Sequence, residues 1–327
     1  MSIIGSYIIS DLSLQVECED NLLGRRIIDA IDGYFYMTKL DSPNSSPNIT
    51  LRFKNNNSTI KFTEFAQELF ISSLQVLKDG NFHYLVNGDS IIQLNVKNCT
   101  GIGSLDSDFW NSSLKSKHDF LMLSILWLIR PHGLYALHAN SAAKDEVGVL
   151  VVGDTGSGKS TTALSLIRQG WGYLSDDVTL IRHTPDGIEA IAFLKGFSFD
   201  QNLVKHFPEL NKSSGISSLN GQKRFLDIKP IYPVRFQASC FPKVLIFPKI
   251  VSSDKSKLIP IDRTKALVLL AENSGGIMVD REMVVKQMEV LKGLAYQTSS
   301  YQLLAGRDLY EEPERITEVL NFWPPRH

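Results

Sequence analysis

A glycine-rich segment with a lysine and a serine at fixed spacing is the clearest chemical signal in this chain. The pattern G-x-x-x-x-G-K-[ST] is met by Gly153, Asp154, Thr155, Gly156, Ser157, Gly158, Lys159 and Ser160, with Thr161 following. In such a loop the glycines let successive backbone N–H groups point into one concavity, where they meet phosphate oxygens. The lysine contacts the β- and γ-phosphates, and the serine hydroxyl ligates Mg²⁺. The segment therefore predicts a site for a nucleoside triphosphate such as ATP, together with Mg²⁺.

Two adjacent aspartates follow the loop and supply a second signal. Asp176 and Asp177 interrupt an otherwise apolar segment, WGYLSDDVTLIRH. One carboxylate near the phosphates can help to hold Mg²⁺, and the other can accept a proton from an acceptor hydroxyl. Adjacent aspartates also occur in solvated turns, but the apolar context favours a functional pair. His138, upstream in LYALHANSAAK, is compatible with either a structural or a functional role.

Strands and helices at the expected spacing position these residues. The apolar segment EVGVLVVGD predicts a buried strand that enters the loop, and a helix over 159–169 leaves it, stopped by Gly170. LYALHANSAAK and WGYLSDDVTLIRH predict neighbouring strands, the second interrupted by the aspartates. IEAIAFLKGFSF and CFPKVLIFPKI predict further strands, and TKALVLLAENSG, REMVVKQMEVLKGLAYQ and about 313–321 predict helices. The alternation of strand, helix and strand predicts an α/β core.

The first third of the chain has a different pattern. Short alternating segments such as ITLRF, FHYLV and SIIQLNV are separated by turn-forming residues, which predicts a β-rich domain. Within LDSDFWNSSLKSKHDFLMLSILWLIRPHG the apolar period shifts from two towards three or four, which predicts a helix. We therefore place the domain boundary near Ser112, with a β-rich domain over 1–112 and the P-loop domain over 113–327.

Composition excludes several classes of partner. The formal net charge of the 327 residues is −1, which offers no overall attraction for nucleic acid or an anionic membrane surface. The most apolar run, 120–129, is too short to cross a bilayer. Cys18, Cys99 and Cys240 are far apart, as expected of free buried thiols in a reducing compartment. A cytoplasmic protein is expected.

Three blocks in order resemble the kinase domain of the bacterial HPr kinase/phosphorylase family. They are Leu137-His138-Ala139, the loop 153–160, and Ser175-Asp176-Asp177 after a helix that ends in Arg168-Gln169-Gly170. The resemblance implies a fold related to phosphoenolpyruvate carboxykinase and transfer of phosphate from ATP to a serine hydroxyl of a small protein. It also implies that Asp176 is the acid/base, that His138 tunes its charge, and that Asp177 and Ser160 serve Mg²⁺ while Lys159 binds phosphate.

One segment departs from the family pattern. Where the family carries a Glu-x-Arg-Gly strand, this chain has Phe193-Leu194-Lys195-Gly196, which lacks the glutamate. The departure argues against the reverse, phosphorylase reaction and against HPr itself as the acceptor. The β-rich N-terminal portion and the C-terminal segment look more like divergent members of the superfamily, including lasso-peptide kinases that phosphorylate a serine of a precursor peptide.

These observations favour a serine kinase acting on a peptide or small protein. A P-loop with a nearby carboxylate also suits a small-molecule hydroxyl kinase, and a nucleotide-dependent regulatory ATPase is the alternative from another class. The resemblance implies a homo-oligomer, and residues 1–112 are candidates for acceptor docking.

Overall fold

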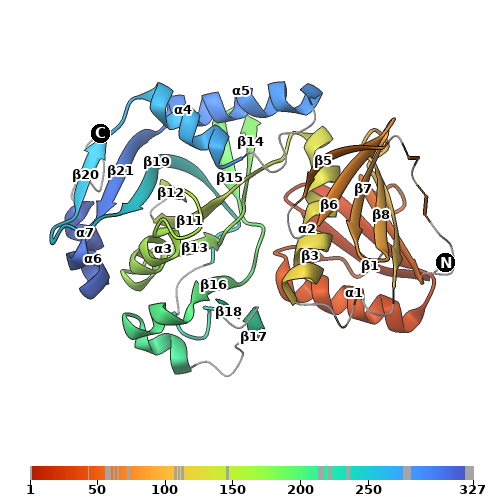
Figure 1. Ribbon diagram of the computed structural model, residues 1–327, viewed down its shortest axis with the longest axis horizontal. Coiled ribbons are helices and arrows are strands. Elements are labelled where there is room, and N and C mark those ends of the chain that lie inside the picture. Colours follow the sequence, from red (N-terminus) through yellow and green to blue (C-terminus); the bar gives the residue numbers. More distant parts are fainter. Residues whose placement is uncertain are drawn as a thin grey trace. The chain divides into compact units, whose positions relative to one another are not determined.

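A computed structural model of the chain shows two compact units, residues 1–135 and 136–327 (Figure 1). The structure describes residues 2–42, 44–55, 60–61, 63–64, 66–71, 74–106, 109, 111, 114–144, 147–212, 217–219, 223–232, 236–274 and 281–320. None of its described helices is long and apolar enough to cross a membrane.

The first unit is a sheet covered by two helices. Its described strands run in the order β3-β1-β2-β4-β9-β8-β7-β6-β5. They are β1 (Ser2–Ile9), β2 (Leu12–Cys18), β3 (Thr38–Lys39), β4 (Ile49–Asn55), β5 (Gln67–Ile71), β6 (Gln75–Asp79), β7 (Phe82–Asn87), β8 (Ser90–Asn95) and β9 (Thr100–Leu105). The predicted β-rich character of this region is therefore observed.

Helix α1 (Asn21–Tyr34) has no counterpart in the sequence-based prediction. The side chain of Asp20 caps its first turn by accepting from the backbone N–H of Leu23 at 2.7 Å. Leu23, Ile27 and Ile31 are buried and recur at helical spacing, so this face packs on β1, β2 and β4.

Helix α2 (Leu114–Ile129) belongs with the first unit. It packs on β7, β8 and β9, and its residues Phe120, Trp127 and Leu128 are fully buried. The sequence assigned this helix to the second domain by placing the boundary near Ser112, whereas the units divide after Tyr135. Burial of the apolar second half of this helix, from Phe120 onward, against the N-terminal sheet explains the difference. Residues 112 and 113 themselves lie outside the described residues.

The second unit is built on a mixed sheet in the order β10-β14-β15-β19-β12-β11-β13, extended by β21 beside β19 and by β20 beside β21. Its strands are β10 (Tyr135–Leu137), β11 (Ala139–Lys144), β12 (Val147–Val152), β13 (Gly172–Ser175), β14 (Thr179–Thr184), β15 (Gly187–Ile191), β19 (Ser239–Ile250), β20 (Lys257–Pro260) and β21 (Ser299–Ala305). β12 is parallel to β19, and β19 is parallel to β21, so the carboxyl ends of these three strands share one edge of the sheet.

Helices cover both faces of this sheet (Figure 1). Val149 and Val151 of β12 pack with Leu166 of α3 (Lys159–Arg168). Because side chains alternate along a strand, Leu150 and Val152 face the other side. That side carries α5 (Arg281–Gln297), which contacts β14, β15 and β19 and packs with α4 (Arg263–Glu272). The second unit is therefore an α/β domain, as predicted.

A small sheet packs on the far side of α3. It contains β16 (Phe197–Asp200), β18 (Lys223–Leu226) and β17 (Ser217–Leu219), with short 3₁₀ turns at Gln201–Lys205 and Pro208–Lys212. Leu164 and Ile167 of α3 join Phe197, Phe199 and Phe207 in one buried cluster. Helix α3 is therefore held between two layers, which fixes the position of its first turn.

The C-terminal segment is shorter in regular structure than the helix predicted over 313–321. It contains α6 (Arg307–Glu311), a 3₁₀ turn at Pro313–Arg315 and α7 (Ile316–Val319). Asn321 lies outside the described residues. Leu309 and Ile316 pack with Leu166 of α3, so this segment is tied to the helix that follows the loop.

Candidate active site

The glycine-rich loop joins the carboxyl end of β12 to the start of α3. Gly156 and Gly158 have φ of 84° and 105°, in the left-handed region that favours glycine. The loop closes on itself through a bond from the N–H of Ser157 to the carbonyl of Asp154 at 3.1 Å. Helix α3 then begins at Lys159. The strand, loop and helix predicted from the sequence are thus observed in that order, and the start of such a helix favours anions.

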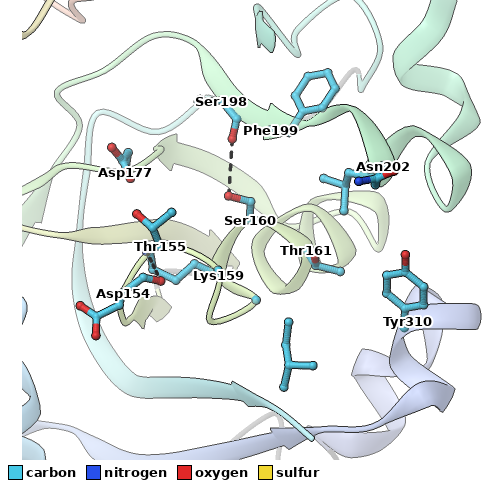
Figure 2. Close-up of a pocket in the computed structure, with 14 residues that line it drawn as sticks. Asp154, Thr155, Lys159, Ser160, Thr161, Asp177, Ser198, Phe199, Asn202 and Tyr310 are labelled. Atoms are coloured by element: carbon cyan, nitrogen blue, oxygen red, sulfur yellow. Dashed lines mark hydrogen bonds between the residues drawn. The ribbon is translucent and has the colours of Figure 1, made fainter. Parts of the chain in front are cut away.

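A cavity of about 360 Å³ opens over this loop (Figure 2). Eight residues predicted for the site line it: Asp154, Thr155, Gly156, Gly158, Lys159, Ser160, Thr161 and Asp177. Residues that the sequence did not single out complete the lining: Ser198, Phe199, Asn202, Leu203, Ile250 and Tyr310. Gly153, Ser157, His138 and Asp176 lie outside the lining. The structure therefore brings most of the predicted phosphate ligands to one cavity with one of the two aspartates.

The ammonium group of Lys159 is held by three acceptors. It donates to the carbonyl oxygens of Gly153 at 2.5 Å and Asp154 at 3.0 Å, and to Nε2 of His138 at 2.9 Å. The residue is 6% exposed. An ammonium group has three donors, so these bonds use its full capacity. Binding of a phosphate by Lys159 must therefore replace at least one of them.

The contacts of His138 define its tautomer. Nε2 accepts from Lys159, while Nδ1 lies 2.9 Å from the carbonyl oxygen of Asp177, which only accepts, so Nδ1 carries the hydrogen. Burial lowers the pKa of His138 and the positive charge of Lys159 lowers it further, against the opposing effect of the Asp177 carboxylate. His138 is therefore neutral at pH 7. It links the loop lysine to the aspartate pair.

Asp176 is a buried structural anchor in this structure. It is 2% exposed, and its two oxygens accept from Nδ2 of Asn140 at 2.5 Å and from the N–H of Ser198 at 2.6 Å. Ser198 belongs to β16 and lines the cavity. The Asp176 carboxylate thus connects the aspartate turn to the strand that forms part of the cavity wall.

Asp177 faces the cavity on a strained turn. Its φ is 62°, and the N–H of Val178 donates to the carbonyl of Asp176 at 2.6 Å, which closes a γ-turn around Asp177. This conformation is rare outside glycine, and backbone strain of this kind is concentrated at functional sites. The side chain is 52% exposed and lines the cavity, so the turn directs one carboxylate outward while its neighbour stays buried.

Residues 193–196, which depart from the family pattern, are hydrogen-bonded to the residue that precedes the two aspartates. The N–H groups of Phe193 and Leu194 donate to Oγ of Ser175 at 3.2 and 2.9 Å. Lys195 does not line the cavity. The segment therefore holds the residue that precedes the aspartates and offers the cavity no carboxylate.

The oxygen ligands that face the cavity fit a magnesium ion. Ser160 and Asp177 both line the cavity and both offer oxygen, which Mg²⁺ prefers. Among the residues that the structure describes, no group of three or more His, Cys, Asp or Glu side chains could hold a metal. This sparse set fits Mg²⁺, because sites of this kind bind the ion through one or two protein groups together with phosphates and water.

Comparison with known proteins relates part of the chain to one family. Proteins named HPr kinase/phosphorylase from Chlorobium phaeovibrioides and Chlorobium luteolum are each 32% identical to it over 91 residues, which is 27% of this chain and 25% of each relative. One from Chlorobium chlorochromatii is 39% identical over 64 residues, 20% of this chain and 17% of the relative. The chain thus aligns with about a quarter of the length of these relatives.

The solved HPr(Ser) kinase/phosphatase from Coxiella burnetii is 20% identical to this chain and covers 37% of this chain and 61% of its own, with a TM-score of 0.25. No protein-family profile matches the chain. The resemblance to the HPr kinase/phosphorylase family that the sequence motifs indicated is nevertheless confirmed by the named relatives.

Proposed function

We propose that this protein is an ATP- and Mg²⁺-dependent kinase that transfers the γ-phosphoryl group to a serine hydroxyl of a peptide or small protein. The observation that carries the proposal is the cavity in which the phosphate loop and the carboxylate of Asp177 meet. A phosphate donor on the loop would place its terminal phosphate near a group able to accept a hydroxyl proton. Similarity to HPr kinase/phosphorylases supports the same reaction class.

The loop supplies the donor side of this reaction. Loop N–H groups and the start of α3 would hold the phosphates, and Lys159 would exchange a carbonyl or His138 for a phosphate oxygen. Ser160 and Asp177 would hold Mg²⁺, which neutralises charge on the phosphates when bound. Neutral His138 keeps an acceptor beside Lys159 without adding a second positive charge.

On the acceptor side we assign different roles to the two aspartates. Asp177 reaches the cavity and is the carboxylate placed to take the serine proton, as well as to face the metal. Asp176, which the family resemblance made the acid/base, has both oxygens occupied and is not in the lining. We therefore assign Asp176 the positioning of Ser198 and of the turn that presents Asp177.

The acceptor class and the remaining expectations rest on the sequence. A peptide or small-protein serine follows from the resemblance, and a ribosomally made precursor peptide follows from the likeness to lasso-peptide kinases. Residues 1–112 are the candidate for acceptor docking because the proposed chemistry lies wholly in the second unit. A fold relation to phosphoenolpyruvate carboxykinase, assembly into a homo-oligomer and a cytoplasmic location belong to the same proposal.

A labelling experiment tests the proposed reaction. The purified chain, Mg²⁺ and γ-labelled ATP are incubated with an extract of the source organism separated into metabolites, peptides and proteins. Phosphoserine in a peptide or protein, recognised as alkali-labile and acid-stable label, would support the proposal. Label confined to metabolites would indicate a small-molecule kinase. Release of free phosphate alone, at a rate independent of any fraction, would indicate a regulatory ATPase.

A further inference from the structure

A second, more apolar cavity lies beside the phosphate loop. Its volume is about 260 Å³, more than ten times the roughly 15 Å³ that one water needs. Ile250, Ala305, Leu309 and Tyr310 contribute to its lining, together with the charged Arg307. None of the predicted catalytic residues lines it. Arg307 lies 3.7 Å from a carboxylate oxygen of Asp254, which offsets its charge. The cavity therefore suits an apolar, uncharged group better than a phosphate.

The two cavities are neighbours that share part of their walls. Gly158, Thr161, Ile250 and Tyr310 line both. The apolar cavity is built where parallel strands β19 and β21 end, at Ile250 and Ala305, along the edge at which β12 enters the loop. Ligands of α/β sheets bind outside the carboxyl ends of such strands. One ligand with a charged end and an apolar end could therefore occupy both cavities.

The order of residues along the phosphate cavity gives that ligand a direction. Figure 2 shows Asp177 at one end and Tyr310 at the other, with Lys159, Ser160 and Thr161 between them. The acceptor carboxylate is thus at the end remote from the apolar cavity. A nucleotide whose terminal phosphate points towards Asp177 would direct its nucleoside towards Tyr310.

Two exposed apolar side chains flank the shared wall. Tyr310 is 50% exposed and Ile250 is 63% exposed. The Tyr310 ring packs on His206, with ring centroids 3.8 Å apart, which supports it from the small-sheet side of the second unit. A planar base covered by a tyrosine ring and an aliphatic side chain gains stacking and apolar burial.

We propose that the apolar cavity holds the base of the nucleotide, with Tyr310 as its stacking partner and Ile250 as its second contact. The inference rests on the proposed function for the presence of a nucleoside triphosphate. The inference adds to the proposed function a residue, Tyr310, that distinguishes ATP from inorganic polyphosphate. Contacts with Tyr310 and Ile250 increase affinity for the nucleoside and leave the affinity for phosphate groups unchanged.

The test compares calorimetric affinities of the full chain for MgATP and for magnesium tripolyphosphate, which has the phosphates but no base. We expect Tyr310→Ala to weaken MgATP binding at least about fivefold, as loss of a base stack does, and tripolyphosphate binding by less than about twofold. Tyr310→Phe retains the ring and should stay within about twofold for both ligands. Tyr296→Ala is the matched control, because Tyr296 is 56% exposed on α5 and lines neither cavity.

Ile250→Ala provides an independent variant, since an exposed side chain is truncated with little effect on folding. Ile250→Ala should also weaken binding of MgATP more than binding of magnesium tripolyphosphate. Equal affinity of the unaltered chain for MgATP and tripolyphosphate would overturn the inference, as would equal weakening of both ligands in Tyr310→Ala and Ile250→Ala. A chain that shows the selective pattern and phosphorylates nothing would refute the kinase while leaving the base site intact. Phosphoserine formation without the selective pattern would do the reverse.

Discussion

Replacing the two adjacent aspartates by asparagine, one at a time, should change two different properties. Asp176→Asn should lower the stability of the fold, and Asp177→Asn should lower the rate of phosphoryl transfer. In Asp176→Asn, one oxygen becomes an NH₂ group that faces a donor, either Nδ2 of Asn140 or the N–H of Ser198. Asn140 cannot turn its amide over to compensate, because its Oδ1 already accepts from the N–H of Asp177 at 3.0 Å. Loss of a charge-assisted bond and an unsatisfied buried donor should lower the free energy of unfolding by about 3 kcal/mol.

In Asp177→Asn the same exchange should leave stability almost unchanged. The side chain is 52% exposed, and asparagine is tolerated at positive φ, so the free energy of unfolding should change by less than about 0.5 kcal/mol. The variant loses the group that accepts the hydroxyl proton. Phosphoryl transfer should therefore fall by about 10²–10⁴-fold.

Thermal unfolding and transfer of labelled phosphate, measured on both variants, separate the two roles. For a unit of this size, about 3 kcal/mol corresponds to a melting temperature lower by about 6–12 °C in Asp176→Asn. Asp177→Asn should melt at the same temperature as the unaltered chain and transfer phosphate about 10²–10⁴-fold more slowly. The reasoning is refuted if Asp177→Asn transfers phosphate normally while Asp176→Asn melts normally and is inactive, since Asp176 would then be the acid/base.

Three further changes test the loop and its surroundings. Gly158→Ala places a side chain on a residue with φ of 105°, so it should lower the free energy of unfolding in denaturant by about 1–3 kcal/mol and weaken tripolyphosphate binding. The control Gly33→Ala in α1, where a Cβ meets nothing within 4 Å, should do neither. Unchanged tripolyphosphate affinity in Gly158→Ala would contradict the assigned loop. Ser160→Ala should raise the Mg²⁺ concentration needed for ATP binding by about tenfold, and an unaltered Mg²⁺ titration would remove Ser160 from the metal site. Because the pKa of His138 is lowered in the folded protein, its contribution to stability is present above the unfolded pKa of about 6.5 and is lost as pH falls through the folded pKa. The melting temperature of the unaltered chain should therefore decline more steeply below pH 6.5 than that of His138→Gln. Parallel declines in the two proteins would show that His138 is not responsible.

The phosphate site was predictable because its chemistry is local in the sequence. Glycines at fixed spacing determine the loop conformation, and an apolar strand before it and a helix after it follow from periodicity alone. The break between β13 and β14 was also predictable, since two carboxylates cannot continue an apolar strand without cost. The sequence therefore located Lys159, Ser160 and the aspartate pair.

Other features depend on contacts between distant residues. Asp176 and Asp177 are chemically identical, and only the turn geometry and the partners Asn140 and Ser198 distinguish the buried one from the exposed one. Tyr310 lies in a short helix with no motif around it, and it reaches the cavity because the C-terminal segment packs on α3. No local pattern carries that information.

Two features of the first 135 residues were missed from the sequence. Helix α1 could have been predicted from its Asp20 cap and its spacing of apolar residues, but its short amphipathic segment lies among strand-like patterns. Helix α2 was predicted from the sequence, but it was assigned to the wrong unit. Its apolar residues indicate that the helix is buried, and they do not indicate which of the two sheets covers it.

The convergence of β12, β19 and β21 at one edge has a consequence for how the second unit holds together. Their carboxyl ends belong to segments that are far apart in the chain and meet only after folding. A nucleotide that contacts the ends of all three strands would bind the folded unit and not the unfolded chain, and would therefore stabilise the fold reversibly. At a hundred times its dissociation constant such a ligand adds about 2.7 kcal/mol to the free energy of unfolding. Resistance to proteases should then increase with the concentration of nucleotide.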